Sequence, residues 1–298
     1  MTAIANALRE DLNFLVTNRL PRNAATRFMR WFSRIEQPLV RDASIAIWRR
    51  FADLELHEAA KARFTSLHDC FTRTLKEGAR TVDRDPSTIV SPCDGIVGAG
   101  GRIAGTRVLQ AKGMPYTLEE LLGDAQLAAS MADGAYVTLR LTASMYHRFH
   151  APDACTVRRV TYVSGDTWNV NPIALARIER LFCRNERAIV HLELQGDPPC
   201  RLLLVAVGAI LVGSVRLHCL PDVAAHAPGV RHHDCHARYE RGDELGWFEH
   251  GSTIIVIAPA SVRLAESASK GHTVRMGEPL LHSPVARRHA QVAKASRP

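Results

Sequence analysis

The sequence lacks the cysteine patterns by which disulfide frameworks and zinc ribbons are recognised. Its cysteines are odd in number, widely scattered and without a Cys-x-x-Cys pair, so neither class is expected. They are Cys70, Cys93, Cys155, Cys183, Cys200, Cys219 and Cys235. We therefore expect a protein of a reducing compartment.

The sequence also lacks an apolar run long enough to cross a bilayer. The longest, "LLLVAVGAILVGSV" from Leu202 to Val215, is bounded by arginines and falls short of the roughly 20 residues that a spanning helix needs. We interpret it as core strands. Residues 9–11 are charged and no apolar segment with a small-residue cleavage site follows, which argues against a secretory signal.

Acidic residues are fewer than basic ones, 30 against 38, and the formal net charge is +8. This balance favours an acidic partner, but charge alone does not choose between anionic lipid, nucleic acid and acidic small molecules. With 298 residues, of which 46% are hydrophobic, the chain can fold as one large globular domain or two modest ones.

Roughly the first 80 residues have helical periodicity. Within "TRFMRWFSRIEQP", Phe28, Trp31, Phe32 and Ile35 fall on one helical face, arginines occupy the others, and Pro38 ends the pattern. The segment "RDASIAIWRRFADLEL" repeats this mixture. Such composition is typical of helices in a lipid headgroup layer, but it also fits helices that pack on the main domain with solvated arginines.

After "DRDPSTIVSPCDG" the sequence changes to short β-rich segments such as "GAYVTLRLT", "CTVRRVTYV" and "STIIVIAP", separated by Gly, Pro and Asp. We therefore predict an α+β fold. A helical, membrane-associating region at residues 1–80 precedes a β-rich catalytic domain at residues 81–298, whose core is mostly antiparallel.

Two stretches carry side chains suited to acid–base chemistry. In "SPCDG", Asp94 lies in a turn where backbone donors can hold a carboxylate, although Asp-Gly is also an ordinary turn. In "YHRFHAPD", His147 and His150 are three residues apart. Because histidine titrates near neutral pH, we favour a general base over a metal ligand.

Metal binding has a second possible source in "RHHDCH", which ends at His236. Zinc needs three or four ligands, however, and none follow the histidine pair at a usual spacing. The polar surroundings of "RHHDCH" predict a mobile loop. We expect no metal site.

The stretch "LGWFEHGSTIIVIAP" places Gly251 and Ser252 at the start of a β-branched strand. A hydroxyl becomes a nucleophile only when a base removes its proton and an acid orients that base. Asp94, a histidine and Ser252 would fill these roles. Because the serine directly follows Gly251, one conceivable electrophile is the Gly251 carbonyl, which predicts self-cleavage.

Five ordered motifs resemble those of the phosphatidylserine decarboxylases. The segment "RGDELGWFEHGST" is similar to the family's self-processing motif, which usually ends in Leu-Gly-Ser-Thr. The other four are "SPCDG", "HRFHAP", "NVNP" and "FCRNER". His250 stands where Leu is usual and Cys93 where Ala is common, and neither departure removes a reactive group.

The resemblance implies that Ser252, activated by His150 and Asp94, attacks the Gly251 carbonyl to form an ester. β-Elimination would then release residues 1–251 as a β chain. Loss of ammonia would leave a pyruvoyl group, the cofactor, at the start of an α chain of residues 252–298.

The resemblance further implies that this pyruvoyl group forms a Schiff base with the serine amine of phosphatidylserine. It would act as an electron sink while carbon dioxide leaves, giving phosphatidylethanolamine in phospholipid biosynthesis, and His147 would protonate the α-carbon. Other implied partners are an anionic membrane surface, at the cytoplasmic face of the cell membrane, and a second copy in a homodimer of the two-chain unit. Nucleic acid is not expected.

Three alternatives stay open. A related pyruvoyl-dependent enzyme could decarboxylate a free amino acid such as tryptophan. A serine hydrolase could use Asp94, a histidine and Ser252 without cutting itself, but it would more often carry Gly-x-Ser-x-Gly, which is absent. A non-enzymatic basic lipid- or nucleic-acid-binding module would leave the five motifs unexplained.

Overall fold

The computed structural model describes residues 22–52, 54–110, 114–209, 215–220, 228–249 and 253–284. Within this part of the chain every pairing between named strands is antiparallel, and three helices precede the first strand in sequence. The predicted α+β fold with a mostly antiparallel core is confirmed.

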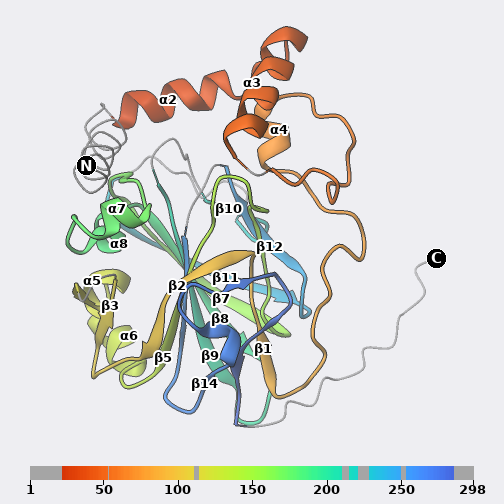
Figure 1. The fold of residues 1–298 in the computed structure, drawn as a ribbon. Coiled ribbons are helices and arrows are strands. Elements are labelled where there is room, and N and C mark those ends of the chain that lie inside the picture. The colour runs from red at the N-terminus through yellow and green to blue at the C-terminus, as the bar shows by residue number, and fades with distance from the viewer. Residues whose placement is uncertain are drawn as a thin grey trace, which may run out of the picture.

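The core is an eight-stranded sheet (Figure 1). Its strands, in spatial order, are β11 (Val230–Tyr239), β7 (Cys155–Val163), β8 (Arg187–Leu194), β9 (Cys200–Val207), β13 (Thr253–Ala258), β5 (Ala135–Arg140), β2 (Gly95–Arg102) and β15 (Thr273–Val274). Strand β13, which follows the Gly251-Ser252 pair, therefore lies inside the sheet with β9 on one side and β5 on the other.

Both faces of this sheet are covered, which explains why β13 is a continuous hydrophobic run. Ile254 and Val256 belong to one core cluster, and Ile255 and Ile257 belong to the other. The second cluster includes residues of α5 (Leu118–Leu122), α6 (Ala125–Ser130), α7 (Pro172–Leu175) and α8 (Leu181–Arg184). These short helices lie on one side of the sheet in Figure 1.

Two smaller sheets cover the other face. One has the order β10 (Val215–Leu217), β12 (Glu244–Phe248) and β6 (Arg148–His150). The other has the order β1 (Thr88–Val90), β16 (Pro279–His282) and β14 (Arg263–Leu264). Residues of both pack in the same core cluster as Ile254. The remaining elements are the pair β3 (Arg107–Leu109) and β4 (Pro115–Thr117), and the 3-10 turn η1 (Glu266–Ala268).

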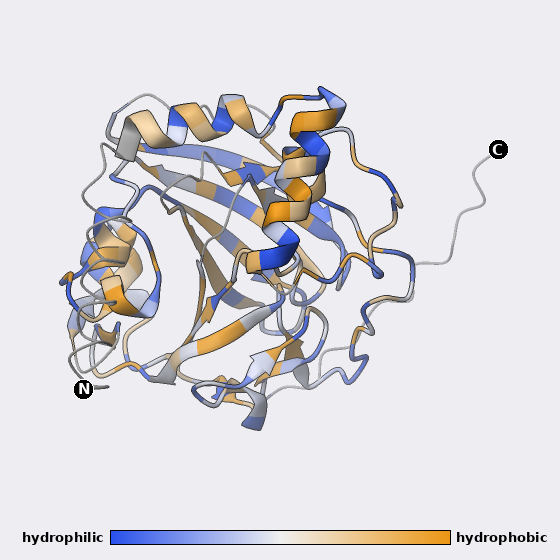
Figure 2. Cartoon of the chain, turned by 45° about the horizontal axis from the view of Figure 1, so that its top comes forward, coloured by the Kyte–Doolittle hydropathy of each residue, from blue (hydrophilic) through white to orange (hydrophobic). Residues whose placement is uncertain are grey.

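Three helices form the N-terminal part of the described chain: α2 (Arg22–Phe32), α3 (Pro38–Phe51) and α4 (Leu67–Phe71). The first predicted helix ends before Pro38, as expected, and Pro38 begins the next one. The two longer helices carry both hydrophobic and hydrophilic residues (Figure 2). Phe28 is 58% exposed and Trp31 is 64% exposed, so α2 presents aromatic rings to the surroundings.

None of the helices within the described ranges is long and apolar enough to cross a membrane. Helix α3 has no buried residue along its length. Its Trp48 stacks on Phe71 of α4 with ring centroids 5.6 Å apart, which attaches α3 to the rest of the molecule. The helices are thus joined to the core by a few contacts while much of their apolar surface is uncovered.

The expectation of a mobile loop at "RHHDCH" is wrong, because His232 to His236 belong to strand β11. Among the described strands it lies at the edge of the large sheet and pairs with β7 alone. An edge strand with one solvated face tolerates charged and polar side chains, so its sequence loses the hydrophobic signal of a strand. The run from Leu202 is confirmed as a core strand as far as Val207, and residues 210–214 lie outside the described ranges.

Candidate active site

The strand register places Asp94 and the start of β13 at the same end of the large sheet. Arg140 of β5 pairs with Ile96 of β2 on one side and with Thr253 of β13 on the other. Because β2 and β13 both run antiparallel to β5, both begin at this end. Asp94 is two residues before Ile96, and Ser252 directly precedes Thr253 in the chain.

The serine itself is not described. His250, Gly251 and Ser252 lie outside the described residues, so the structure gives the two flanks of the predicted cleavage point, Glu249 and Thr253. Thr253 is fully buried and paired on both sides. The chain that follows the predicted cleavage point is therefore fixed from its first described residue.

Asp94 is buried in a network of charges. Arg80 binds both of its carboxylate oxygens, with Nε 2.9 Å from Oδ1 and Nη2 2.6 Å from Oδ2, and the Met276 N–H donates to Oδ1 at 2.9 Å. Arg80 Nη1 also donates to Glu58 Oε2 at 2.8 Å. Burial opposes the charge of Arg80, but its bonds to the two carboxylates outweigh that effect and raise its pKa.

His150 is held as a neutral ring with a defined tautomer. Its Nδ1 is 2.8 Å from the Gly242 carbonyl oxygen, which can only accept, so Nδ1 carries the proton. Nε2 is 3.0 Å from the Tyr146 hydroxyl and accepts its hydrogen bond. Gly242 has a φ of +89°, a conformation that favours glycine and aims its carbonyl at the ring.

Burial lowers the pKa of His150, while its bond to Gly242 and the nearby charges of Glu244 and Asp94 act in the opposite direction. The lowered pKa keeps the ring unprotonated at neutral pH. Nε2 is therefore the basic nitrogen, and His150 has the protonation state that a general base requires.

The predicted pairing of Asp94 with His150 is seen only as proximity. The His150 backbone N–H donates to the Pro92 carbonyl at 2.7 Å, which places the ring beside the "SPCDG" turn. The hydrogen bond of Nδ1 nevertheless goes to Gly242, and the Asp94 oxygens bind Arg80 and Met276. The orienting role of Asp94 therefore stays a prediction.

His147 lies directly before β6 and is fully buried. Its ring packs against Phe71 of α4, with centroids 3.9 Å apart, and its carbonyl accepts from the Phe248 N–H at 3.0 Å. The histidine thus lies beside the end of β12, the strand that leads toward Gly251. Its predicted role as the proton donor to the α-carbon is not tested by these contacts.

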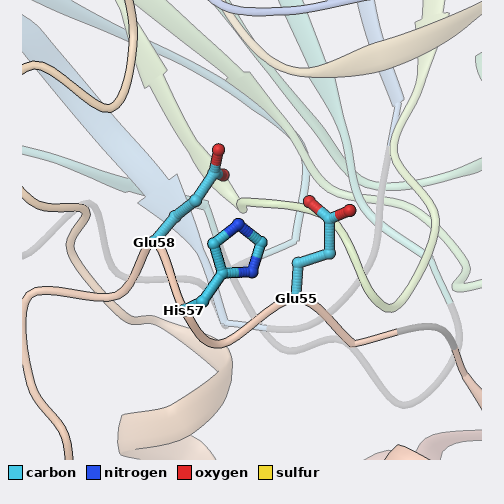
Figure 3. A group of neighbouring side chains, drawn as sticks. All are labelled: Glu55, His57 and Glu58. Carbon is cyan, nitrogen blue, oxygen red and sulfur yellow. The ribbon is translucent and has the colours of Figure 1, made fainter.

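Among the residues that the structure describes, one group of possible metal ligands comes together, at Glu55, His57 and Glu58 (Figure 3). Their ligand atoms lie within 4.8 Å of one another, but Glu58 already binds Arg80 and Arg275. Of these three residues, Glu58 is joined through Arg80 to Asp94. The expectation of no metal site stays a prediction.

Sequence reasoning missed Arg80, Tyr146 and Gly242. Arg80 is one of many arginines, and nothing in its neighbours marks it as the partner of Asp94. Gly242 contributes a backbone carbonyl, which no residue pattern reveals. Tyr146 alone had a signal, since it stands four residues before His150 in "YHRFH".

Comparisons with known proteins identify the family of this chain. The family model described as phosphatidylserine decarboxylase matches residues 67–282. The phosphatidylserine decarboxylase proenzyme of Methylococcus capsulatus is 36% identical over 286 residues, which cover 93% of this chain and 97% of that protein. The proenzyme of the same name from Anaeromyxobacter sp. is 38% identical over 269 residues, 88% of this chain and 94% of that one. The chain belongs to the phosphatidylserine decarboxylase family.

Proposed function

We propose that this chain decarboxylates phosphatidylserine to phosphatidylethanolamine after cutting itself between Gly251 and Ser252. The observation that carries the proposal is His150, held neutral with Nε2 as its basic nitrogen. It lies beside Asp94 at the end of the sheet where β13 begins. Family membership supplies the substrate, since the relatives are named for it.

In the self-processing step, His150 Nε2 takes the proton of the Ser252 hydroxyl. The oxygen attacks the Gly251 carbonyl, the C–N bond breaks, and an ester joins the two parts. A base then removes the α-proton of residue 252, and elimination breaks the bond between its β-carbon and the ester oxygen, which leaves Gly251 as a carboxylate and residue 252 as dehydroalanine. The dehydroalanine tautomerises to an imine. Water adds to the imine carbon, ammonia leaves, and residue 252 becomes the pyruvoyl group.

The pyruvoyl group supplies an electron sink for the loss of carbon dioxide. The residues present fit such a group. Strand β13 is fully buried and paired on both sides, so Thr253, the residue to which a pyruvoyl group at position 252 would be attached, is held rigidly. His147, buried against Phe71 beside the end of β12, is the proposed donor of a proton to the product carbon.

The substrate assignment is tested by product analysis. The purified protein is incubated with phosphatidylserine in detergent and, separately, with free tryptophan, and the amine products are measured. Phosphatidylethanolamine from the first and nothing from the second is the expected result. Conversion of tryptophan alone would favour the free amino acid enzyme, and hydrolysis without release of carbon dioxide would favour a serine hydrolase.

The pH dependence of the self-processing rate should follow the protonation of His150. Because burial lowers its pKa, processing should be constant at neutral pH and fall only when the pH drops below the usual histidine value of about 6.5. Tyr146→Phe removes a hydrogen bond to the neutral ring, so the midpoint should rise by roughly 0.7 pH units, equivalent to about 1 kcal/mol. Rates of cleavage of fresh precursor between pH 4.5 and 8 give both midpoints. An unchanged midpoint in the variant would show that another group titrates.

We also propose peripheral binding to the cytoplasmic face of an anionic membrane through α2 and α3. Exposed Phe28 and Trp31 would enter the headgroup layer, and exposed arginines would attract anionic lipid. This places the two longer helices on the membrane side, with the site beneath them. A homodimer of the processed two-chain unit remains a proposal from family membership.

The membrane contribution can be measured with Arg27, Arg49 and Arg50, which are exposed on these helices. Each basic side chain near an anionic surface contributes about 1 kcal/mol, so the triple change to Gln should weaken binding up to roughly a hundredfold. Sedimentation with phosphatidylglycerol vesicles at low and high salt measures it, and activity on detergent-dispersed substrate should stay unchanged. Equal binding by variant and parent would mean that these helices do not face the lipid.

A further inference from the structure

Glu249 is a buried carboxylate on the N-terminal flank of the predicted cleavage point. It directly follows β12, precedes Gly251 by two residues, and is 4% exposed. Its Oε1 accepts from Arg34 Nη2 at 2.9 Å and from Arg216 Nε at 3.3 Å. The self-processing mechanism described above does not use this carboxylate.

The two arginines come from different parts of the molecule. Arg34 lies in the turn after α2, and Arg216 lies in β10 opposite Trp247 of β12. Glu249 is therefore tied both to the small sheet that carries it and to the N-terminal helices. A buried carboxylate depends strongly on such partners, because removing one leaves an incompletely compensated charge out of water.

Self-processing requires a serine oxygen and a neighbouring carbonyl to meet in a geometry that the relaxed chain does not favour. The C-terminal flank is fixed by the pairing of Thr253 on both sides. The N-terminal flank is held by the Phe248 N–H, which donates to the His147 carbonyl at 3.0 Å, and beyond Phe248 by the ion pairs of Glu249 with Arg34 and Arg216. Fixing both flanks limits the motion of the bond between them, and a displacement of about 1 Å can slow such a reaction by about a hundredfold.

We propose that Arg34 and Arg216 are positioning residues for self-processing, which act by holding Glu249 and with it the chain that leads to Gly251. The inference rests on the proposed function, since it presumes cleavage between Gly251 and Ser252. It extends the processing machinery beyond the β-rich part of the chain to the turn after α2. Loss of either arginine should therefore slow maturation without removing a reacting group.

The test follows the cleavage of freshly translated, labelled precursor over time. Arg34→Gln and Arg216→Gln should each slow the appearance of the two fragments by about 10- to 100-fold. The matched control is Arg63→Gln, which removes the same charge from an exposed position between α3 and α4 and should process at the parent rate. Arg34→Lys, which keeps a cation within reach of Glu249, should recover part of the lost rate.

A second comparison separates positioning from general destabilisation. If the arginine acts through the carboxylate, the double variant Arg34→Gln/Glu249→Gln should process no more slowly than Glu249→Gln alone. The thermal midpoint of the Arg34→Gln precursor, measured with Ser252→Ala added to prevent cleavage, should stay within a few degrees of its own parent.

Three outcomes would overturn the inference. Parent-like rates for both Arg34→Gln and Arg216→Gln would do so while leaving the proposed function intact, as long as Ser252→Ala blocks cleavage. Additive effects of Arg34→Gln and Glu249→Gln would show that the two residues act separately. A parent chain that never cleaves would remove the proposed function and this inference together.

Discussion

Ser252→Ala is expected to abolish self-processing and decarboxylation together. The alanine has no oxygen to attack the Gly251 carbonyl, and no pyruvoyl group can arise from it. Loss of the nucleophile in a serine protease lowers the rate by on the order of 10⁶, so no cleavage should be detectable. A denaturing gel should show a single chain of 32.9 kDa, and the preparation should release no carbon dioxide from phosphatidylserine.

The matched control for this variant is Ser261→Ala. Ser261 is exposed in the turn that follows β13, so its loss changes a serine close in sequence without touching the site. It should process and decarboxylate as the parent does. Cleavage of the Ser252→Ala chain at the same position would contradict the assignment of the nucleophile.

Arg80→Leu is expected to give the largest loss of stability among single changes near the site. Arg80 is the cation shared by Asp94 and Glu58, and all three side chains are largely buried. Removing one partner of a buried ion pair costs about 3–5 kcal/mol, because it leaves charge uncompensated out of water. Urea unfolding in a Ser252→Ala background, which keeps the chain in one piece, measures this change in the free energy of unfolding.

Arg275→Gln is the control, because Arg275 binds the same Glu58 at 3.4 Å but is 52% exposed. An exposed pair of this kind contributes at most about 1 kcal/mol. Adding Asp94→Asn to Arg80→Leu should recover part of the lost stability by removing an unpaired charge. If Arg80→Leu lowered the free energy of unfolding no more than Arg275→Gln, the proposal that the buried ion pair with Arg80 stabilises the Asp94 carboxylate would be wrong.

The strand that anchors the site could be predicted from sequence, and its position in the sheet could not. The β-branched run from Thr253 to Ile257 indicates a buried strand because both of its faces are apolar. Its neighbours β9 and β5 are separated from it by long stretches of chain, and periodicity carries no information about such pairing. Strand β11 was missed for the opposite reason, since its solvated face hides the strand pattern.

The motifs identified Asp94 and His150, but the contacts that set their chemistry are distant in sequence. The proton on Nδ1 of His150 is fixed by the carbonyl of Gly242, and the charge of Asp94 is balanced by Arg80. Residue type indicates which groups can react, whereas protonation state depends on neighbours that only the fold supplies. Sequence reasoning therefore found the acid–base residues and missed those that hold them.

The predicted domain boundary between residues 80 and 81 rests on the local sequence pattern, which changes there from helical periodicity to short β-rich segments. Contacts cross this boundary at the site itself: Phe71 packs on His147, and Arg80 binds Asp94. Arg34 reaches Glu249 in the same way. Local periodicity cannot reveal such contacts, so the separation of a membrane-associating region from a catalytic domain stays a prediction while the N-terminal helices contribute to the site.

The intact mass of the purified, active protein tests the central claim most directly. The account predicts two chains, residues 1–251 and residues 252–298. At 32.9 kDa for 298 residues, the shorter chain should weigh roughly 5 kDa. Its mass should be lower, by one molecule of ammonia, than that of the same peptide with an N-terminal serine, and it should resist Edman degradation. A single uncut chain of 32.9 kDa in a fully active preparation would contradict the account.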